Sequence, residues 1–163
     1  MSDQHQPFLR AGEVIPAFSL PGADGMPHSP WDYKQREHLV LLLLTSATSG
    51  QARGILRELK QSYRAFREEE CALLVLTADS VVTHLRMQEE LQLPFALLAD
   101  PQGQVLARYT FWDATARTVL PSIVLANRYS AFYAQWIAQQ EAELPTLDVL
   151  LANLQYMNTV CTP

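Results

Sequence analysis

Cysteine is scarce in this chain, and its scarcity excludes two classes of protein. Among 163 residues there are only two cysteines, Cys71 and Cys161, and no Cys-x-x-Cys pair. Disulfide-held secreted domains and zinc modules need more cysteines at closer spacing. A chain of this length buries roughly 68–70% of its unfolded surface, so it needs no disulfide framework.

Basic blocks and long apolar runs are also absent. The 17 acidic residues outnumber the 12 basic ones, giving a net charge of −5. This balance argues against a nucleic-acid partner. The longest apolar run, Leu39 to Leu44, is far shorter than the ~20 residues that cross a bilayer. Met1 to Pro7 lacks the basic and apolar parts of a secretory signal. We expect a cytoplasmic protein without a membrane partner.

The histidines give no sign of a metal centre. His5, His28, His38 and His84 have no metal-ligand spacing such as His-x-x-x-His, and neither cysteine accompanies them. We therefore predict no metal site and no cofactor.

Two aliphatic runs predict buried parallel strands, at residues 38–44 and 71–78. Each is followed by a segment with helical periodicity, at residues 51–69 and 80–91. In the second helix we expect Val82, Leu85, Met87 and Leu91 to face inward. Cys71 begins the second strand and is predicted to be buried and inert.

The second half predicts a hairpin and a closing helix. A short apolar stretch at 95–99 precedes a turn at 100–103 and a short helix at 104–109. Residues 122–126 and 131–136 are strand-like and joined by a turn, and residues 146–157 carry a leucine stripe. The order β-α-β-α-β-β-α predicts an α/β protein with a mixed sheet and helices on both faces.

The domain organisation is simple. Residues 11–33 are punctuated by Pro and Gly, which limits them to short extended pieces with a turn at Asp24-Gly25, an N-terminal β extension. We predict a flexible N-terminus at 1–10, a single domain at 11–158 and a tail at 159–163.

Several motifs resemble the peroxiredoxin branch of the thioredoxin superfamily, which comprises AhpC/TSA and redoxin domains. The resemblance extends from about Leu9 to Asn153 and is carried by Gly12-x-x-Ile15-Pro16-x-Phe18-x-Leu20-x-x-x-Asp24-Gly25, by Ser29-x-x-Asp32-Tyr33 and by Leu91-x-Leu93-Pro94-Phe95-x-Leu97-Leu98-x-Asp100-Pro101-x-Gly103. It implies a thioredoxin-like fold. By the same resemblance, Pro121 falls where such proteins carry a cis-proline.

The resemblance places the family's chemistry where the first strand meets the long helix. A helix start there favours a thiolate over a thiol. Aligning residues 52–59 with the family's Cys-x-x-x-Leu-x-Glu-Leu puts Ala52 at the peroxidatic cysteine, Ser49 at the family's Thr and Thr45 at its Pro. The family's catalytic arginine falls at Pro121 or is displaced to Arg117. The four residues that align with the thioredoxin Cys-x-x-Cys motif are Ser49-Gly50-Gln51-Ala52, and both cysteines are missing from them.

Ser49 admits two interpretations. As a nucleophile it would need an adjacent base, which no sequence neighbour provides, and the Gly-x-Ser-x-Gly pattern is missing. As a helix N-cap it is a favoured residue type. We predict the N-cap, and with it no catalytic residue at Ser49 or Ala52.

The prediction is a degenerate site in a non-catalytic binding or interaction module. Its pocket is expected to involve Thr45, Thr48, Ser49, Gly50, Gln51, Trp112 and Pro121, holding a small anion or a peptide. The aromatic Trp112 is either a pocket wall or core filling.

Two other hypotheses stay open. The chain could be an antioxidant enzyme, a thiol oxidoreductase or peroxidase, that uses a relocated redox thiol at Cys161. Alternatively, it could be a structural subunit that forms a homodimer or pairs with an active relative.

Overall fold

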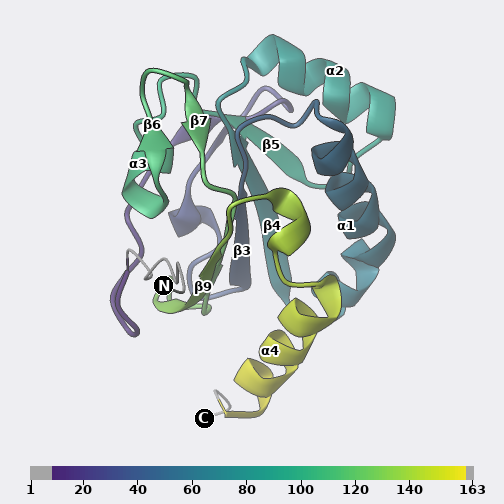
Figure 1. Ribbon diagram of the computed structural model, residues 1–163. Helices are drawn as coiled ribbons and strands as arrows, with labels where there is room; N and C mark the ends of the chain where they lie inside the picture. The colour runs from purple at the N-terminus through teal and green to yellow at the C-terminus, as the bar shows by residue number, and fades with distance from the viewer. Residues whose placement is uncertain (1–8, 161–163) are drawn as a thin grey trace.

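The computed structural model describes residues 9–160 (Figure 1). Its centre is a five-stranded sheet in the order β5-β4-β3-β8-β9. The strands are β3 (His38–Leu43), β4 (Cys71–Thr77), β5 (Ala96–Ala99), β8 (Ser122–Ala126) and β9 (Phe132–Ile137). β3, β4 and β5 are parallel, whereas β8 and β9 are antiparallel to their neighbours. The predicted mixed α/β sheet is confirmed.

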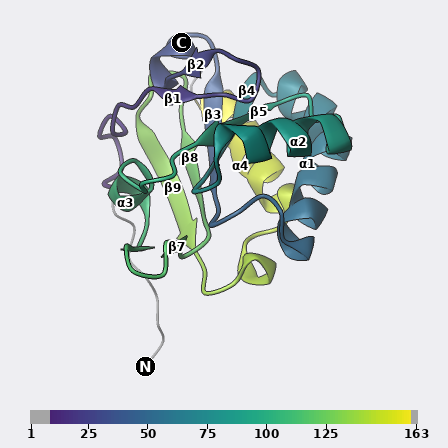
Figure 2. The same cartoon turned by 90° about the horizontal axis from the view of Figure 1, so that it is seen from above.

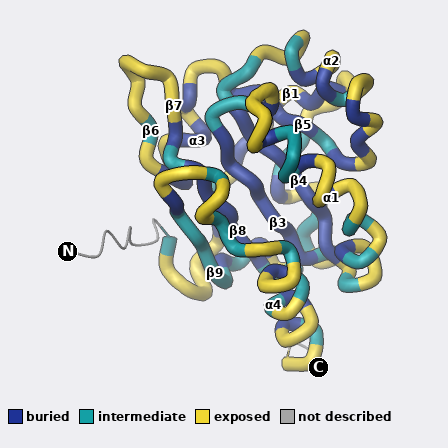
Figure 3. Tube along the Cα trace, turned by 45° about the vertical axis from the view of Figure 1, so that its right-hand side comes forward, coloured by how far each residue is buried: buried dark blue, intermediate teal, exposed yellow. Residues whose placement is uncertain are grey.

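β3 and β4 form the middle of the core because every one of their residues is buried, as Figure 3 shows in dark blue. Alternate side chains of β3 enter different hydrophobic clusters. Val40 and Leu42 belong to the cluster beneath α1, while Leu39 and Leu41 belong to the cluster on the opposite face. Continuous aliphatic runs are expected for strands that are covered on both faces.

The long helices cover one face of the sheet. They are α1 (Gly50–Glu68), α2 (Val81–Leu91) and α4 (Leu147–Val160). All three contribute buried residues to the same cluster as Val40 and Leu42. The opposite face is covered by the N-terminal segment and the one-turn helix α3 (Leu106–Tyr109). Figure 2 shows α3 on the far side of the sheet from α1.

The predicted N-terminal β extension is a small hairpin of β1 (Leu20–Pro21) and β2 (Pro27–His28), followed by a 3₁₀ turn, η1 (Pro30–Asp32). Gly25 adopts a φ of +82° in the hairpin turn, a conformation that favours glycine. The N–H of Ala23 donates to the carbonyl of Leu97 at 3.1 Å. This bond attaches the hairpin to the outer edge of β5.

Several elements differ from the sequence-based expectation. β5 is a fifth strand of the sheet rather than only an apolar stretch. A second small hairpin consists of β6 (Trp112–Asp113) and β7 (Thr118–Val119), and a second 3₁₀ turn is η2 (Glu141–Glu143). These short elements have few residues and little periodicity, so the sequence pattern does not reveal them.

The inward face of α2 also differs. Met87 and Leu91 are buried as predicted, but Val82 and Leu85 are exposed by 61% and 44%. The third buried position is His84, which is completely inaccessible to solvent. His84, a hydrogen-bonded polar residue, thus takes one of the inner positions of α2. The buried face of the helix is therefore rotated relative to the predicted one.

The C-terminal helix is longer than predicted, because α4 continues through Val160. Leu150, Leu154 and Met157 are its buried residues, which confirms the leucine stripe as core. The other predicted tail residues, with Cys161, lie outside the described residues, as do residues 1–8 of the predicted flexible N-terminus. Within residues 9–160, no helix has the length and apolar character to span a bilayer.

Candidate functional site

The candidate site lies at the carboxyl ends of β3 and β4, where the loop from Thr45 to Ser49 leads into α1. In open α/β sheets, ligands commonly bind at these strand ends. Thr45 connects the loop to β7: its hydroxyl accepts a hydrogen bond from the N–H of Val119 at 3.0 Å and donates to the carbonyl of Val119 at 3.3 Å. The predicted strand–helix junction is therefore held against the β6–β7 hairpin.

Ser49 is the N-cap of α1. Its backbone is extended, and its side-chain oxygen accepts a hydrogen bond from the N–H of Ala52 at 3.1 Å. The N-cap interpretation is confirmed. Arg53 reaches back to the carbonyl of Thr48 at 3.1 Å and forms an ion pair with Glu90 of α2 at 3.2 Å. The helix start is thus fixed by its own cap and by a link to α2.

Ala52 is the third residue of α1 and has no solvent-accessible surface. Its methyl group belongs to the hydrophobic cluster that contains Leu44, Ala47 and Leu56. Thr48, Gly50 and Gln51 differ in being exposed. The start of α1 therefore has a polar, accessible outer side and an apolar, closed inner side.

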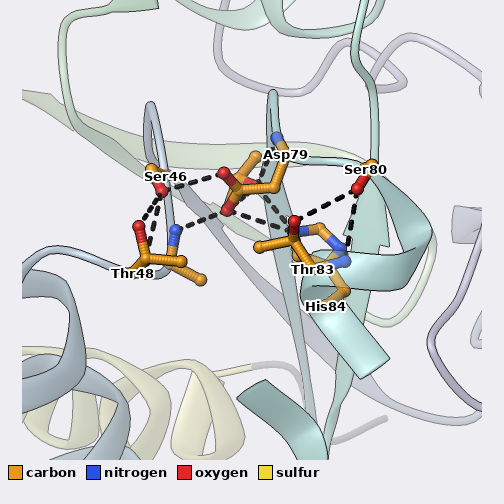
Figure 4. Close-up of polar contacts among 8 residues, drawn as sticks. Ser46, Thr48, Asp79, Ser80, Thr83 and His84 are labelled. Carbon is orange, nitrogen blue, oxygen red and sulfur yellow. Dashed lines mark hydrogen bonds and ion pairs between the residues drawn. The ribbon is translucent and has the colours of Figure 1, made fainter. Parts of the chain in front are cut away.

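An acid at the end of β4, Asp79, organises this loop, and the sequence analysis missed it (Figure 4). Its carboxylate accepts hydrogen bonds from the N–H of Ala47 at 2.7 Å, the hydroxyl of Ser46 at 2.8 Å and the hydroxyl of Thr77 at 2.9 Å. Ser46 in turn lies 2.8 Å from the hydroxyl of Thr48. One carboxylate thereby ties the β3–α1 loop to the β4–α2 loop.

The electrostatics of Asp79 follow from these contacts. Burial alone raises the pKa of the carboxyl group, but hydrogen bonds from His84, Ala47, Ser46 and Thr77 outweigh it and lower the pKa to about 2. Asp79 is consequently ionised at every pH near neutrality. Its charge is permanently available to hold the loop.

His84 completes this group from the buried side of α2. Its Nε2 lies 2.6 Å from the hydroxyl of Thr77 and 3.6 Å from the Asp79 carboxylate. Its Nδ1 is buried and has no hydrogen-bond partner among the described residues. The useful sequence signal was Thr77-x-Asp79-Ser80 directly after a parallel strand, with His84 one helical turn beyond the Ser80 N-cap. A search for metal-ligand spacing alone does not detect this pattern.

Trp112 lies on the β6–β7 hairpin, half-buried against the loop after β5. Its ring covers the backbone of Gly103 so closely that a Cβ there would lie 2.1 Å from ring atom Cε2. Trp112 borders two hollows of about 410 and 300 Å³, which are lined by Pro101, by Gln102 and by residues of the segment 111–120. Neither hollow is lined by any of residues 45–51. These two hollows therefore do not join Trp112 to the loop residues of the predicted pocket.

The expectation for Pro121 is wrong. No peptide bond within residues 9–160 is cis. The trans isomer suits the local backbone, because Leu120 donates to the carbonyl of Phe111 and Pro121 accepts from the N–H of Ala138, at 3.0 and 2.9 Å. Pro121 thus lies directly before β8. Trans is also the intrinsic preference of most X-Pro bonds.

Arg117 occupies an exposed turn between β6 and β7 with a φ of +56°. Its guanidinium donates to the carbonyl of Pro101. The structure therefore connects this arginine to the loop after β5.

Cys71 is the single cysteine among residues 9–160. It is completely buried at the start of β4, and its Sγ lies 3.3 Å from the carbonyl of Ala72. Burial raises the pKa of the thiol far above its ordinary value. The predicted burial is confirmed. Cys161 lies outside the described residues.

The sequence from residue 11 to 130 matches the family model of the AhpC/TSA family. This chain belongs to the AhpC/TSA family. The match covers the N-terminal extension, the strands β3, β4, β5 and β8 and the candidate site, but not β9 or α4. The AhpC/TSA part of the predicted resemblance is confirmed. No curated protein shows significant sequence similarity to this AhpC/TSA-family chain.

Solved structures confirm the fold. The chain is similar to the peroxidoxin BcpB of Mycobacterium tuberculosis, with a TM-score of 0.79, 17% identity and coverage of 91% of this chain and 98% of the other. AhpC of Enterococcus faecalis gives a TM-score of 0.81 at 14% identity, covering 95% and 98% of the two chains. The thiol peroxidase of Chromobacterium violaceum gives 0.75 at 21% identity, covering 91% and 88%. The AhpC/TSA-family chain thus has the thioredoxin-like peroxiredoxin fold.

Proposed function

We propose that this AhpC/TSA-family protein is a non-catalytic binding or interaction module built on the peroxiredoxin fold. The observation that carries the proposal is Ala52. At the position that aligns with the family's peroxidatic cysteine, the chain has a methyl group that is fully buried in the core. Only a thiolate attacks a peroxide or a disulfide, and alanine has no lone pair to offer.

The other residues of the site support the same conclusion. Ser49 uses its side-chain oxygen to cap α1, and within residues 9–160 no basic side chain is hydrogen-bonded to that oxygen. Cys71 is buried and its thiol pKa is raised. Asp79 and His84 are occupied in holding two loops together. Peroxide reduction needs an exposed thiol with a lowered pKa, and none of these residues provides one.

The ligand class we propose is a small anion or an extended peptide at the start of α1. Ser49 satisfies the N–H of Ala52, while Gly50 and Gln51 precede it at exposed positions. Unpaired N–H groups and the helix dipole favour negative charge at such a place. Addition of inorganic phosphate should then shift the amide resonances of residues 48–52 in preference to those of exposed residues in α4.

Peroxide turnover tests the proposal directly. The wild-type protein and the Cys71→Ala/Cys161→Ala double mutant should both consume hydrogen peroxide no faster than a thiol-free control protein. Turnover in the wild type that disappears in the double mutant would instead favour a relocated thiol at Cys161. Turnover that persists in the double mutant would show chemistry without cysteine.

Two further measurements separate the alternatives. A Cys161 that alkylates at the rate of an unstructured peptide thiol would contradict the relocated-thiol hypothesis. Light scattering and pull-down against an active relative test the structural-subunit hypothesis. Ala52→Cys tests the alignment, although we expect little or no peroxidase activity because Arg117, the nearest candidate for the family's arginine, is bound to Pro101.

A further inference from the structure

A cavity of about 270 Å³ lies at the opposite end of the sheet from the candidate site. Leu73 near the start of β4 and Ala96 at the start of β5 line it, whereas the candidate site follows the carboxyl ends of β3 and β4. The sides are formed by α1, by α2 and by the segment from β2 to η1. Nothing in the proposed function uses this cavity.

The cavity has an aromatic and aliphatic wall. Tyr63 and Phe95 both line it, with ring centroids 6.3 Å apart and planes tilted by 43°. Leu73 and Leu93 are buried beside them. An apolar cavity of about 150 Å³ suffices for benzene. The present volume therefore accommodates one aromatic ring and a polar substituent.

The charged groups around the cavity already have partners. Asp24 lies 2.8 Å from Nε2 of His28, and Arg67 forms an ion pair with Glu37. An anionic ligand would leave water without finding an unpaired cation among the lining residues, because Arg67 is already paired with Glu37. Because an uncompensated charge is costly to desolvate, the site favours an uncharged ligand over an anionic one.

Two hydrogen-bond acceptors remain at this cavity. Gln88 donates from Nε2 to the carbonyls of Leu93 and Phe95 at 2.9 and 2.7 Å. Its Oε1 is buried and receives no hydrogen bond from the described residues. A buried acceptor without a donor is unfavourable. Oε1 has almost no solvent-accessible surface, so a donor on a ligand reaches it only when the Gln88 side chain rotates toward the cavity.

The second acceptor is the Tyr33 hydroxyl, which lies 3.4 Å from Nδ1 of His28. When Nε2 of a neutral His28 donates to Asp24, Nδ1 accepts from the Tyr33 O–H, and the Tyr33 oxygen keeps a free lone pair. Burial, followed by the nearby charges of Asp32 and Glu37, raises the pKa of Tyr33 to about 12. The hydroxyl thus stays protonated and uncharged around neutral pH.

We propose that this cavity binds a small uncharged aromatic molecule that carries an O–H or N–H donor. The ring packs between Tyr63, Phe95 and Leu73, and the donor reaches the Tyr33 hydroxyl. Rotation of the Gln88 side chain would offer the donor a second acceptor. Phenol is the simplest probe of this chemistry. The site is separate from the start of α1, so its existence does not depend on the proposed function.

A titration of the full-length ¹⁵N-labelled protein tests the proposal. Phenol should shift the amides of residues around Tyr63, Leu73 and Ala96 in a saturable way. Toluene, which has the ring but no donor, and benzoate, which has a charge, should each bind at least 5-fold more weakly. Equal affinity for phenol and toluene, stronger binding of benzoate, or shifts located elsewhere would each overturn the proposal.

Matched variants locate the interaction. Tyr33→Phe should weaken phenol binding about 5-fold while leaving toluene unchanged, and Tyr129→Phe, at an exposed tyrosine outside the cavity, should change neither. Ala96→Leu should fill the cavity and abolish binding, with circular dichroism as a check of folding. If Tyr33→Phe and Tyr129→Phe behave alike toward phenol, the proposed recognition is wrong.

Discussion

The two ends of the central sheet use polar side chains in opposite ways. At the carboxyl end, Asp79 accepts hydrogen bonds from Ser46, Ala47 and Thr77, so its oxygens are fully engaged. At the amino-terminal end of β4 and β5, Gln88 leaves one buried oxygen without a donor beside a cavity. A carboxylate with both oxygens hydrogen-bonded fixes a loop, whereas an amide oxygen without a donor beside a cavity leaves capacity for a ligand.

The largest effect should come from Asp79→Ala. The variant leaves the N–H of Ala47 and the hydroxyls of Ser46 and Thr77 without their acceptor in a partly buried place. We expect the free energy of unfolding to fall by about 3 kcal/mol. Urea denaturation followed by circular dichroism measures this change.

The matched control is Asp113→Ala. Asp113 also accepts two backbone N–H groups, from Thr115 at 2.9 Å and Ala116 at 3.1 Å, but it is exposed. Water can replace its hydrogen bonds, so the expected loss is about 1 kcal/mol or less. Equal losses for Asp79→Ala and Asp113→Ala would show that the network at the carboxyl end has no special role.

The pH dependence of stability should identify Asp79 as the titrating group. Its pKa is lowered from 3.8 to about 2 in the folded protein, so its contribution is complete above pH 4–5 and is lost as the pH falls through 2. The difference in unfolding free energy between wild type and Asp79→Asn should therefore shrink by about 2 kcal/mol between pH 5 and pH 2. A constant difference over this range would contradict the lowered pKa.

Glycine-to-alanine substitutions at the two ends of the central sheet test how far the neighbouring atoms can move to accommodate a new Cβ. In Gly103→Ala the new Cβ would meet the Trp112 ring at 2.1 Å, and the backbone φ is +69°. We expect a loss of about 2 kcal/mol in unfolding free energy. In Gly22→Ala, near the cavity, the Cβ meets side-chain atoms of Asp24 and His28 at 2.6–2.9 Å. Those side chains can move, so the expected loss is about 1 kcal/mol.

The smallest expected change in the free energy of unfolding is that of Gly54→Ala, which serves as a reference for the other variants. Gly54 lies inside α1, and a Cβ there would meet no atom within 4 Å. Gly54→Ala should raise the unfolding free energy by about 0.5–1 kcal/mol, because alanine favours the helix. Thermal denaturation should then show a higher midpoint. A lower midpoint would mean that α1 requires flexibility at this position.

The sequence predicted the elements that have long, regular patterns. The strands at β3 and β4 and the helices α1 and α4 were found because their apolar residues recur over many positions. The short strands β6 and β7 were missed because two residues carry no period. Val82 and Leu85 were assigned to the inside of α2 on hydrophobicity alone, whereas the buried His84 sets the orientation of the helix.

The candidate site was predicted only in part. The Ser49 cap follows from a local preference and was found correctly. The hydrogen bond from Ser46 to Asp79 joins residues 33 positions apart, which no local pattern connects. The trans bond at Pro121 differs from what the resemblance implied, because a resemblance aligns residues and does not determine the isomer of a peptide bond.

By itself, the sequence determined the α/β class, the buried strands and the membership in the AhpC/TSA family, because these depend on local periodicity and on motifs at fixed spacing. Tertiary structure decided which polar groups are satisfied. The closure of Ala52 in the core, the engagement of Asp79 and the unfilled acceptor of Gln88 all arise from contacts between distant segments. Burial and hydrogen bonding are properties of the folded neighbourhood, and no single segment of the chain contains them.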